Sequence, residues 1–540
     1  MKKYIIICSL VASVMSCDDV LNKIPQTDIS TDNFWKTESD FKMAANALYN
    51  SMENNHGETL DLQSDDYYGR SVNEVSAGTL VASNTDKVWT DAYVAIRKAN
   101  DIIENAETSE VEVAIKERYA AEARFFRAYQ YHELVKRFGN IPLITRTLDM
   151  SSPELYEGSA PRNLVIDQII EDLQWASEKL PKKQALTVVD EGRITRGTAL
   201  ALLSRVTLYE GTRRKYHNQG DFQELLRLAK SAANTVISEG EFSLCPDFLG
   251  IFKEVNEGNE ETILRTFYKE TISSGSAPRT RGLVVEANMA PTKNLADAFL
   301  CIDGLPIEYS PLFEGYGNIS TEFKNRDPRM AQTIWEPLTA FENNAPLIPE
   351  LFRARTGYWP KKPGDVTALE KTFVYVDYIL MRYAEVLLNY AEATYELEGS
   401  ISDADLNLSI NKLRERVGMK QLTNAFISEQ KAKGYAMDML DEIRRERRVE
   451  LAGEGYRYDD IIRWKIAEDV LPKEIKGTKF QQNYYENVVP GKDVQVDKDG
   501  FIIVEKSDTR TFDPAKNYLF PLPLRELSLN DKLDQNLGWD

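Results

Sequence analysis

Two polar loops combine aromatic rings with charged side chains in a pattern typical of sugar recognition. The first is Asp65-Asp66-Tyr67-Tyr68-Gly69-Arg70, and the second combines Trp335 with Tyr358-Trp359 in an insert that also holds Tyr268. Flat rings stack on the apolar faces of sugars, while carboxylate and guanidinium groups hydrogen-bond hydroxyls. The alternative is that these rings anchor long loops to the scaffold. We expect ligand contacts from Asp65, Tyr67, Tyr68, Arg70, Tyr268, Trp335, Tyr358 and Trp359.

The chain offers little for catalysis or metal binding. Its only histidines are His56, His132 and His217, too few for a multi-histidine zinc site and poorly suited to a catalytic triad. We assign His132 to a packed helical stripe. The 85 Asp and Glu residues make some close carboxylate pair inevitable, so their number does not indicate a glycosidase. We predict no catalytic activity, no cofactor and no metal site.

The segment Gln495-Val496-Asp497-Lys498-Asp499-Gly500 superficially resembles a calcium-binding loop. Its first ligand position would be Gln495 and its twelfth Lys506, and neither suits the carboxylate roles of such a loop. Residues 501–504 have the composition of a strand. We therefore predict a hairpin turn here.

The basic run Arg444-Arg445-Glu446-Arg447-Arg448 is expected to be structural. Asp441 precedes the first two arginines by three and four residues, and Glu450 follows Arg447 by three, which favours ion pairs within one helix. The net charge of the whole chain is −19, which repels phosphate backbones. Nucleic acid is excluded as a partner.

Composition indicates a globular protein with a large core. The 540 residues are 42% hydrophobic and 28% charged. After removal of the N-terminal segment described next, and apart from its lipid site, only Cys245 and Cys301 remain, which allow at most one disulfide bond. Stability must therefore come mainly from packing.

The N-terminus has the order of a lipoprotein export signal. Lys2 and Lys3 precede an apolar stretch at residues 5–12, and Ser16 lies directly before Cys17. The apolar stretch is much shorter than the roughly 20 residues that span a bilayer. We predict a signal peptide at 1–16, lipidation of Cys17 and a tether at 17–33. An ordinary secretory signal with an incidental cysteine is the alternative.

Amphipathic helices dominate the remaining chain. Apolar residues recur at the i, i+3, i+4, i+7 spacing of a helix in several segments, for example Tyr131, Leu134, Val135 and Phe138. One predicted hairpin pairs a helix from about 195 to 211 with a second from about 221 to 238. These hairpins favour a mainly α fold with a tetratricopeptide-like scaffold, although no strict repeat is present.

The region from about 242 to 375 has a different composition, rich in Gly, Pro and Asn. Short apolar runs at 262–264 and 283–285 predict a few short strands among loops. We expect one domain over 34–540, with scaffold segments at about 34–240 and 376–470. The irregular binding lobe covers about 242–375, and a loop-rich C-terminal part covers 471–540.

Several sequence blocks follow one another in a distinctive order. They are Trp89 with Ile96, Ala99 and Asn100, AEARFFRAY at 121–129, RFGNIPL at 137–143, RGTA at 196–199, RYAEVLL at 382–388, ERRVELAGEG at 446–455, PLP at 521–523 and QNLGW at 535–539. Their order resembles that of the SusD/RagB outer-membrane lipoproteins of Bacteroidetes, over nearly the whole mature chain. Leu537 departs from the proline usual in the family's tail.

This resemblance implies a helical scaffold that carries an irregular lobe, with Trp89 in the core. It also implies a lipid-anchored protein of the cell outer membrane that binds oligosaccharide or polysaccharide and caps a SusC-like TonB-dependent porin. Asp18-Asp19 resembles the surface-export signal of these lipoproteins. Two alternatives stay open: capture of peptide or glycopeptide by the same scaffold, and a structural lid with negligible affinity of its own.

Overall fold

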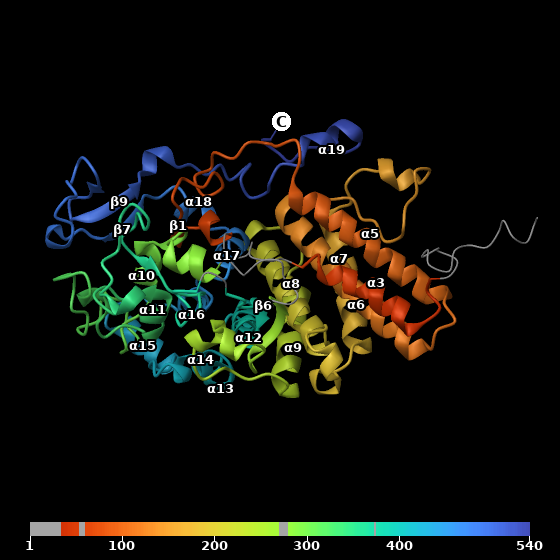
Figure 1. Cartoon of the computed structure of the whole chain (residues 1–540), viewed down its shortest axis with the longest axis horizontal. Helices are drawn as coiled ribbons and strands as arrows, with labels where there is room; N and C mark the ends of the chain where they lie inside the picture. The colour runs from red at the N-terminus through yellow and green to blue at the C-terminus, as the bar shows by residue number, and fades with distance from the viewer. Residues whose placement is uncertain (1–33, 53–59, 269–278, 372–373, 540) are drawn as a thin grey trace, which may run out of the picture.

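The computed structural model describes residues 34–52, 60–268, 279–371 and 374–539 and is mainly α-helical, as predicted (Figure 1). Short strands occur only in small sheets of two or three members in the described chain. Residues 1–33, with the predicted signal peptide, Cys17 and tether, lie outside the described residues. No helix in the described part is long and apolar enough to cross a membrane.

A row of long helices forms the scaffold. In Figure 1 these helices lie side by side, each packed on the next along the chain, and α12 packs on α9. Shorter helices surround this row, among them α16 and α17. The bounds of the long and short helices are α3 (Glu38–Tyr49), α5 (Lys87–Thr108), α6 (Val113–Phe138), α7 (Arg162–Lys179), α8 (Arg196–His217), α9 (Gln223–Glu239), α12 (Tyr383–Glu398), α16 (Met439–Glu450) and α17 (Arg457–Arg463).

The residues of the predicted apolar stripes are buried. Tyr131, Leu134, Val135 and Phe138 of α6 are fully buried, and Trp89 of α5 joins the same core as predicted. His132 is buried too, which confirms its assignment to the packed stripe. Burial of such stripes between neighbouring helices supplies most of the stability of helices of this length.

The α8–α9 hairpin forms, but its first helix does not end at Gly211. The helix continues to His217 and ends at Asn218, which has the left-handed conformation. Gly211 instead allows α9 to approach closely, since a Cβ atom there would lie 2.9 Å from Leu226 Cδ2. Glycine within a helix therefore marks a helix contact here rather than a helix end.

The lobe is irregular and is built around short strand pairs. β2 (Thr262–Thr266) forms where the sequence predicted a strand, and it pairs with β6 (Tyr378–Arg382), which runs directly into α12. The strand predicted at 283–285 is wrong, because these residues belong to a π-helix at Arg279–Val285. The other pairs are β1 (Tyr67–Tyr68) with β3 (Ala290–Pro291) and β4 (Ile334–Trp335) with β5 (Trp359–Pro360).

The C-terminal part contains the predicted hairpin. β8 (Gln495–Val496) pairs with β9 (Phe501–Glu505), which also pairs with β7 (Ile475–Lys479). Asp497 Oδ1 accepts hydrogen bonds from the backbone N–H groups of Asp499 and Phe501, both at 2.9 Å. This carboxylate therefore stabilises the turn.

The basic run of α16 is structural as predicted, but most of its partners lie on other elements. Arg444 pairs with Glu396, Arg447 with Asp460 and Arg448 with Asp66. Only Arg445 pairs within the helix, and it pairs with Glu442 rather than Asp441. The expectation of helix-internal pairs is therefore wrong for most of the run, because α16 is buried between the scaffold and the lobe.

Cys245 and Cys301 are free thiols, and both are buried. They belong to different parts of the lobe core. The described chain is therefore held together without a disulfide bond.

Candidate functional site

The predicted aromatic platform of the insert is buried. Trp335, Tyr358 and Trp359 are between 2% and 6% exposed. The two indoles are opposite each other across β4 and β5, and Phe341 packs against both with ring centroids 4.9 and 5.7 Å away. The expectation that these rings present open faces is wrong, because the lobe has no long helices and uses its largest side chains as its core.

Hydrogen bonds fix these buried rings in place. Trp359 Nε1 donates to the backbone carbonyl of Val284 at 2.7 Å, and the Tyr358 hydroxyl donates to Glu322 at 3.1 Å. Burial raises the pKa of Glu322 to about 7, although the nearby Arg326 opposes the increase. These contacts join β5 to the π-helix and to the short 3-10 helix Thr321–Phe323 that carries Glu322.

Most of the first predicted loop is buried as well. Asp65 lies between Arg457 and Arg448, at 2.8 and 3.3 Å, and Tyr67 pairs with Pro291. Burial alone would raise the pKa of Asp65, but Arg457 and Arg448 hold it well below its usual range. Asp65 thus fastens the loop to α16 and α17, Tyr67 joins it to β3, and both side chains are buried.

Tyr68 and Tyr268 occupy different places. Tyr68 is 5% exposed and its hydroxyl lies beside Arg355; burial raises the pKa of this tyrosine, and Glu505 adds to the increase while Arg355 opposes it. Tyr268 follows β2 and packs against the scaffold core, and its backbone N–H donates to Asp377 Oδ1 at 2.8 Å. The structure therefore keeps Tyr268 apart from the first loop.

Arg70 is the predicted ligand residue that is clearly exposed, and it lies in a cluster that the sequence analysis did not identify. We call this cluster the arginine surface. Its guanidinium groups come from three segments that are far apart in the chain, and an exposed phenylalanine stands beside them. The members are Arg70, Arg281, Glu286, Phe352, Arg353 and Arg355.

Glu286 and backbone carbonyls connect the members of the arginine surface. Arg70 donates to the Glu286 carbonyl at 2.8 Å, and its side chain lies 3.3 Å from the Glu286 carboxylate, which also pairs with Arg281 at 3.1 Å. Arg353 donates to the Val285 carbonyl at 3.4 Å. Arg355 donates to the Arg70 carbonyl, also at 3.4 Å.

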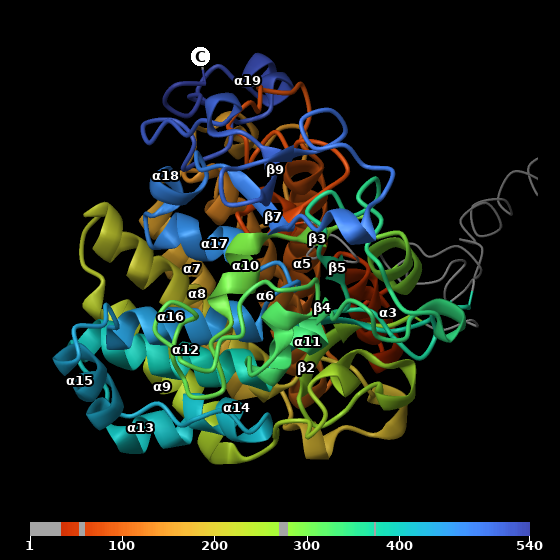
Figure 2. The ribbon, with the colours of Figure 1, turned by 90° about the vertical axis from the view of Figure 1, so that its left-hand side faces the viewer.

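Short, well-anchored elements position the arginine surface. Arg70 follows β1, Arg281 lies in the π-helix, and Glu286 follows directly after it. Phe352, Arg353 and Arg355 lie in a turn that ends in β5, where the backbone N–H groups of Arg353 and Ala354 both donate to the Glu350 carbonyl at 2.9 Å. Figure 2 shows β3, β4 and β5 near one another on this side of the molecule. The buried tryptophans thus support the surface from beneath.

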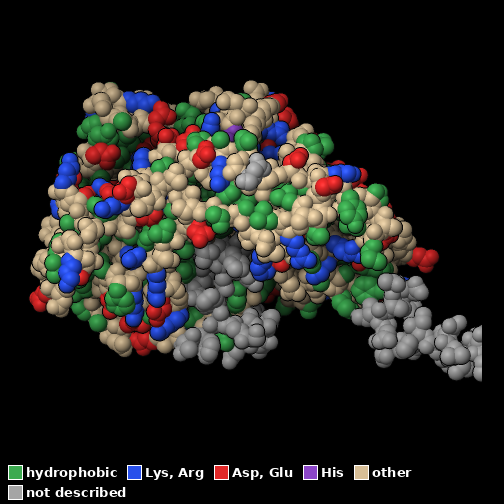
Figure 3. All heavy atoms as spheres, turned by 90° about the horizontal axis from the view of Figure 1, so that it is seen from above, with side chains coloured by type: hydrophobic (Ala, Val, Ile, Leu, Met, Phe, Trp, Pro, Cys, Tyr) green, Lys and Arg blue, Asp and Glu red, His purple; other side chains and the backbone are tan. Residues whose placement is uncertain are grey.

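The arginine surface is locally positive and partly apolar. Its four guanidinium groups face two carboxylates, Glu286 and the neighbouring Glu350, which pairs with Arg353 at 3.2 Å. Phe352 is 73% exposed, and the Arg353 guanidinium lies 5.4 Å from its ring centroid. Figure 3 shows acidic and basic side chains interspersed over the face seen from above.

In the sequence, the arginine surface is indicated by an aromatic residue followed by two closely spaced arginines, in a chain that is acidic as a whole.

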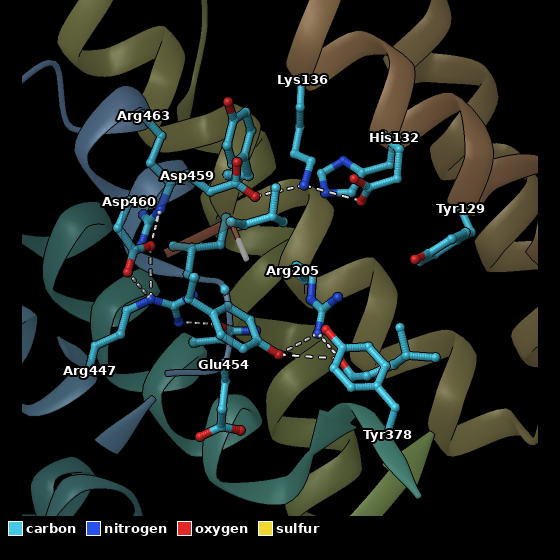
Figure 4. A pocket seen from close by; sticks show the side chains of 18 residues that line it. Tyr129, His132, Lys136, Arg205, Tyr378, Arg447, Glu454, Asp459, Asp460 and Arg463 are labelled. Carbon is cyan, nitrogen blue, oxygen red and sulfur yellow. Dashed lines mark hydrogen bonds and ion pairs between the residues drawn. The ribbon is translucent and has the colours of Figure 1, made fainter. Parts of the chain in front are cut away.

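A small polar cavity of about 60 Å³ lies between α6, α8 and α17. In Figure 4 Lys136 reaches Asp459, and Arg447 and Arg463 both reach Asp460, so its positive side chains have acidic partners. Burial, with Lys136 and Arg205 nearby, lowers the pKa of His132 well below its usual value. The cavity has room for a few water molecules and is too small for a sugar.

A wider groove of about 600 Å³ lies on the scaffold. It runs between α5, the segment around Leu155 and Tyr156, and the C-terminal helix α19 (Leu524–Leu529). Several of its apolar side chains are exposed, among them Val94 and Leu529. No group of three or more metal-ligating side chains is found anywhere in the described chain.

Two family models match the chain. One, described as the SusD family, covers residues 254–539, and the other, described as starch-binding associating with outer membrane, covers residues 9–208. SusD-like protein P2 of Formosa agariphila is 28% identical over 99% of each chain. A SusD-like protein of Bacteroides ovatus is 24% identical over 86% of this chain and 82% of its own.

Solved structures show the same fold. A SusD-like carbohydrate binding protein from Bacteroides fragilis superposes with a TM-score of 0.79 at 25% identity, covering 93% of this chain and all of that one. A laminarin binding SusD-like protein superposes with a TM-score of 0.63 at 23% identity, with the same coverage. The helical scaffold and the irregular lobe are thus shared with these proteins.

Proposed function

Because the chain belongs to the SusD family, we propose that it captures oligosaccharide or polysaccharide at the arginine surface and passes it to a TonB-dependent porin of the outer membrane. The proposal includes no chemical step. The carbohydrate-binding neighbour from Bacteroides fragilis and the laminarin-binding neighbour support glycan as the ligand class. Lipidation at Cys17 would keep the protein at the membrane, and the outer-membrane description of the second family model supports that location.

The observation that carries this proposal is the exposed ring of Phe352 next to the Arg353 guanidinium group, within a cluster of four arginines. The other large rings that we expected at the ligand are at most 6% exposed or packed on the core, whereas Phe352 is 73% exposed. An exposed ring offers a stacking face, and arginine donors next to it can bind the hydroxyls at the edge of the same sugar. The arginine surface therefore combines the two requirements of glycan binding.

The carboxylates of the arginine surface support binding without catalysis. Glycoside hydrolysis requires two carboxyl groups that face each other across the scissile bond, roughly 5–10 Å apart. Glu286 is held between Arg70 and Arg281, and Glu350 is paired with Arg353. Both carboxylates thus position arginines rather than face each other.

Binding of the soluble chain from residue 18 to a polysaccharide panel, by affinity electrophoresis and titration calorimetry, tests the proposal. Phe352→Ala should weaken the complex roughly 5- to 100-fold, because a stacked ring at the centre of a site contributes about 1–3 kcal/mol. Tyr156→Ala is the matched control, since this ring is also exposed but lies in the scaffold groove.

Three outcomes contradict the proposal. Loss of binding in Tyr156→Ala but not in Phe352→Ala would move the glycan to the groove. Binding of peptides but of no polysaccharide would favour peptide capture, and affinity for neither class would favour a structural lid.

A further inference from the structure

The arginine surface concentrates positive charge in an acidic protein. The chain has a formal net charge of −19, yet four arginines from three segments gather around Glu286. Only Glu286 and Glu350 pair with them in the described chain, which leaves the cluster with two positive charges in excess. Like charges held this close repel one another, and an anionic ligand would relieve that repulsion.

Two of these arginines have donors available to a ligand. The side chains of Arg70 and Arg281 are 50% and 55% exposed. Each binds Glu286 through a single terminal nitrogen, Nη2, whereas a guanidinium group carries five N–H donors in a planar fork. Glu286 therefore orients both groups without using their full hydrogen-bonding capacity.

We propose that the ligand of the arginine surface is an acidic polysaccharide that carries uronate or sulfate groups. This inference rests on the proposed glycan-binding function and names its substrate class. Paired donors of a guanidinium group match the paired oxygens of a carboxylate or a sulfate, and such charge-assisted bonds are stronger than bonds to neutral hydroxyls. Phe352 would hold the sugar ring while Arg70 and Arg281 bind the acidic groups on the same or the next residue.

Because the protein as a whole is negatively charged, binding of a polyanion requires a local concentration of positive charge. A polyanion approaching a protein of net charge −19 is repelled at long range, so only a compact positive site can retain it. Attraction between partly exposed charges is screened by salt. Affinity for the acidic polysaccharide should therefore fall as the salt concentration rises, whereas stacking on Phe352 should change little.

The test compares polysaccharides that share a backbone but differ in charge. One pair is polygalacturonate and its methyl-esterified form; the other is a sulfated galactan and its desulfated form. The chain from residue 18 should bind the charged member of at least one pair at least tenfold more tightly. The pair that shows this preference identifies the acidic group as uronate or sulfate.

The variant Arg70→Gln with Arg281→Gln should lose roughly tenfold or more in affinity for the charged member and little for the neutral one. Its matched control is Arg227→Gln with Lys431→Gln, which also removes two exposed positive charges, from positions outside the arginine surface. That control should bind like the unmodified chain. Because all four side chains are about half exposed, unchanged melting temperatures are expected for both variants.

Two results overturn the inference while the proposed function stands. One is equal affinity for both members of each pair. The other is an equal loss in the control variant and in the Arg70, Arg281 variant. Absence of binding to every polysaccharide, neutral or charged, would overturn the proposed function itself.

Discussion

Replacing Trp359 by alanine should destabilise the lobe and leave the ligand surface chemically intact. The indole is 2% exposed, so its removal creates a cavity that costs about 3–5 kcal/mol in the free energy of unfolding. It also leaves the Val284 carbonyl without its donor at 2.7 Å, which adds about 1–3 kcal/mol. The expected total is about 4–8 kcal/mol.

This free energy corresponds to a measurable change in melting temperature. Unfolding entropy is about 2.1 cal/mol/K per residue, which gives about 1 kcal/mol per degree for a chain of 540 residues. Scanning calorimetry should therefore show a decrease of about 4–8 °C for Trp359→Ala. Trp359→Phe keeps most of the ring volume and loses the N–H donor, so its decrease should be about 1–3 °C.

Affinity measured on the same proteins separates a core ring from a binding ring. Phe352→Ala should leave the melting temperature unchanged and weaken glycan binding, because Phe352 is 73% exposed. An unchanged melting temperature in Trp359→Ala together with a large loss of affinity would refute the assignment of Trp359 to the core.

Three further predictions concern the anchor, metal dependence and pH. Cys17→Ala should release the protein from the membrane fraction; retention at the cell surface after a high-salt wash would contradict lipidation at Cys17. Chelation should leave the melting temperature nearly unchanged, and a large decrease that calcium reverses would reveal an oxygen-ligand site. Burial raises the pKa of Glu322 to about 7 in the folded state, above its value in the unfolded chain, so its contribution to stability is complete below about pH 4 and is lost as the pH rises to 7. Glu322→Gln should remove up to about 3 kcal/mol of this pH dependence, and equal slopes of melting temperature against pH in both proteins would count against it.

The scaffold could be predicted from the sequence because its signals are local. The side chain of Thr37 caps α3 by accepting a hydrogen bond from the backbone N–H of Asp40, and the buried residues of α5 and α9 recur with the 3.6-residue period of a helix. The end of α8 was missed because the reason for Gly211 is a contact with Leu226 in the next helix. A close approach of this kind depends on tertiary packing.

The ligand surface was only partly predictable, because exposure in an irregular lobe depends on packing across distant segments. Arg70 was identified, while Trp335, Tyr358 and Trp359 were assigned to the ligand and are buried. A large ring in a loop has the same local sequence signal whether it faces solvent or the core. Phe352 was missed because a single phenylalanine in a turn carries no periodicity.

A crystal structure of the chain from residue 18 with a bound oligosaccharide would locate the ligand on the protein. A sugar ring should stack on Phe352, with its polar groups within hydrogen-bond distance of Arg70 or Arg281. A sugar bound in the scaffold groove beside Tyr156, with the arginine surface empty at saturating ligand, would contradict this prediction.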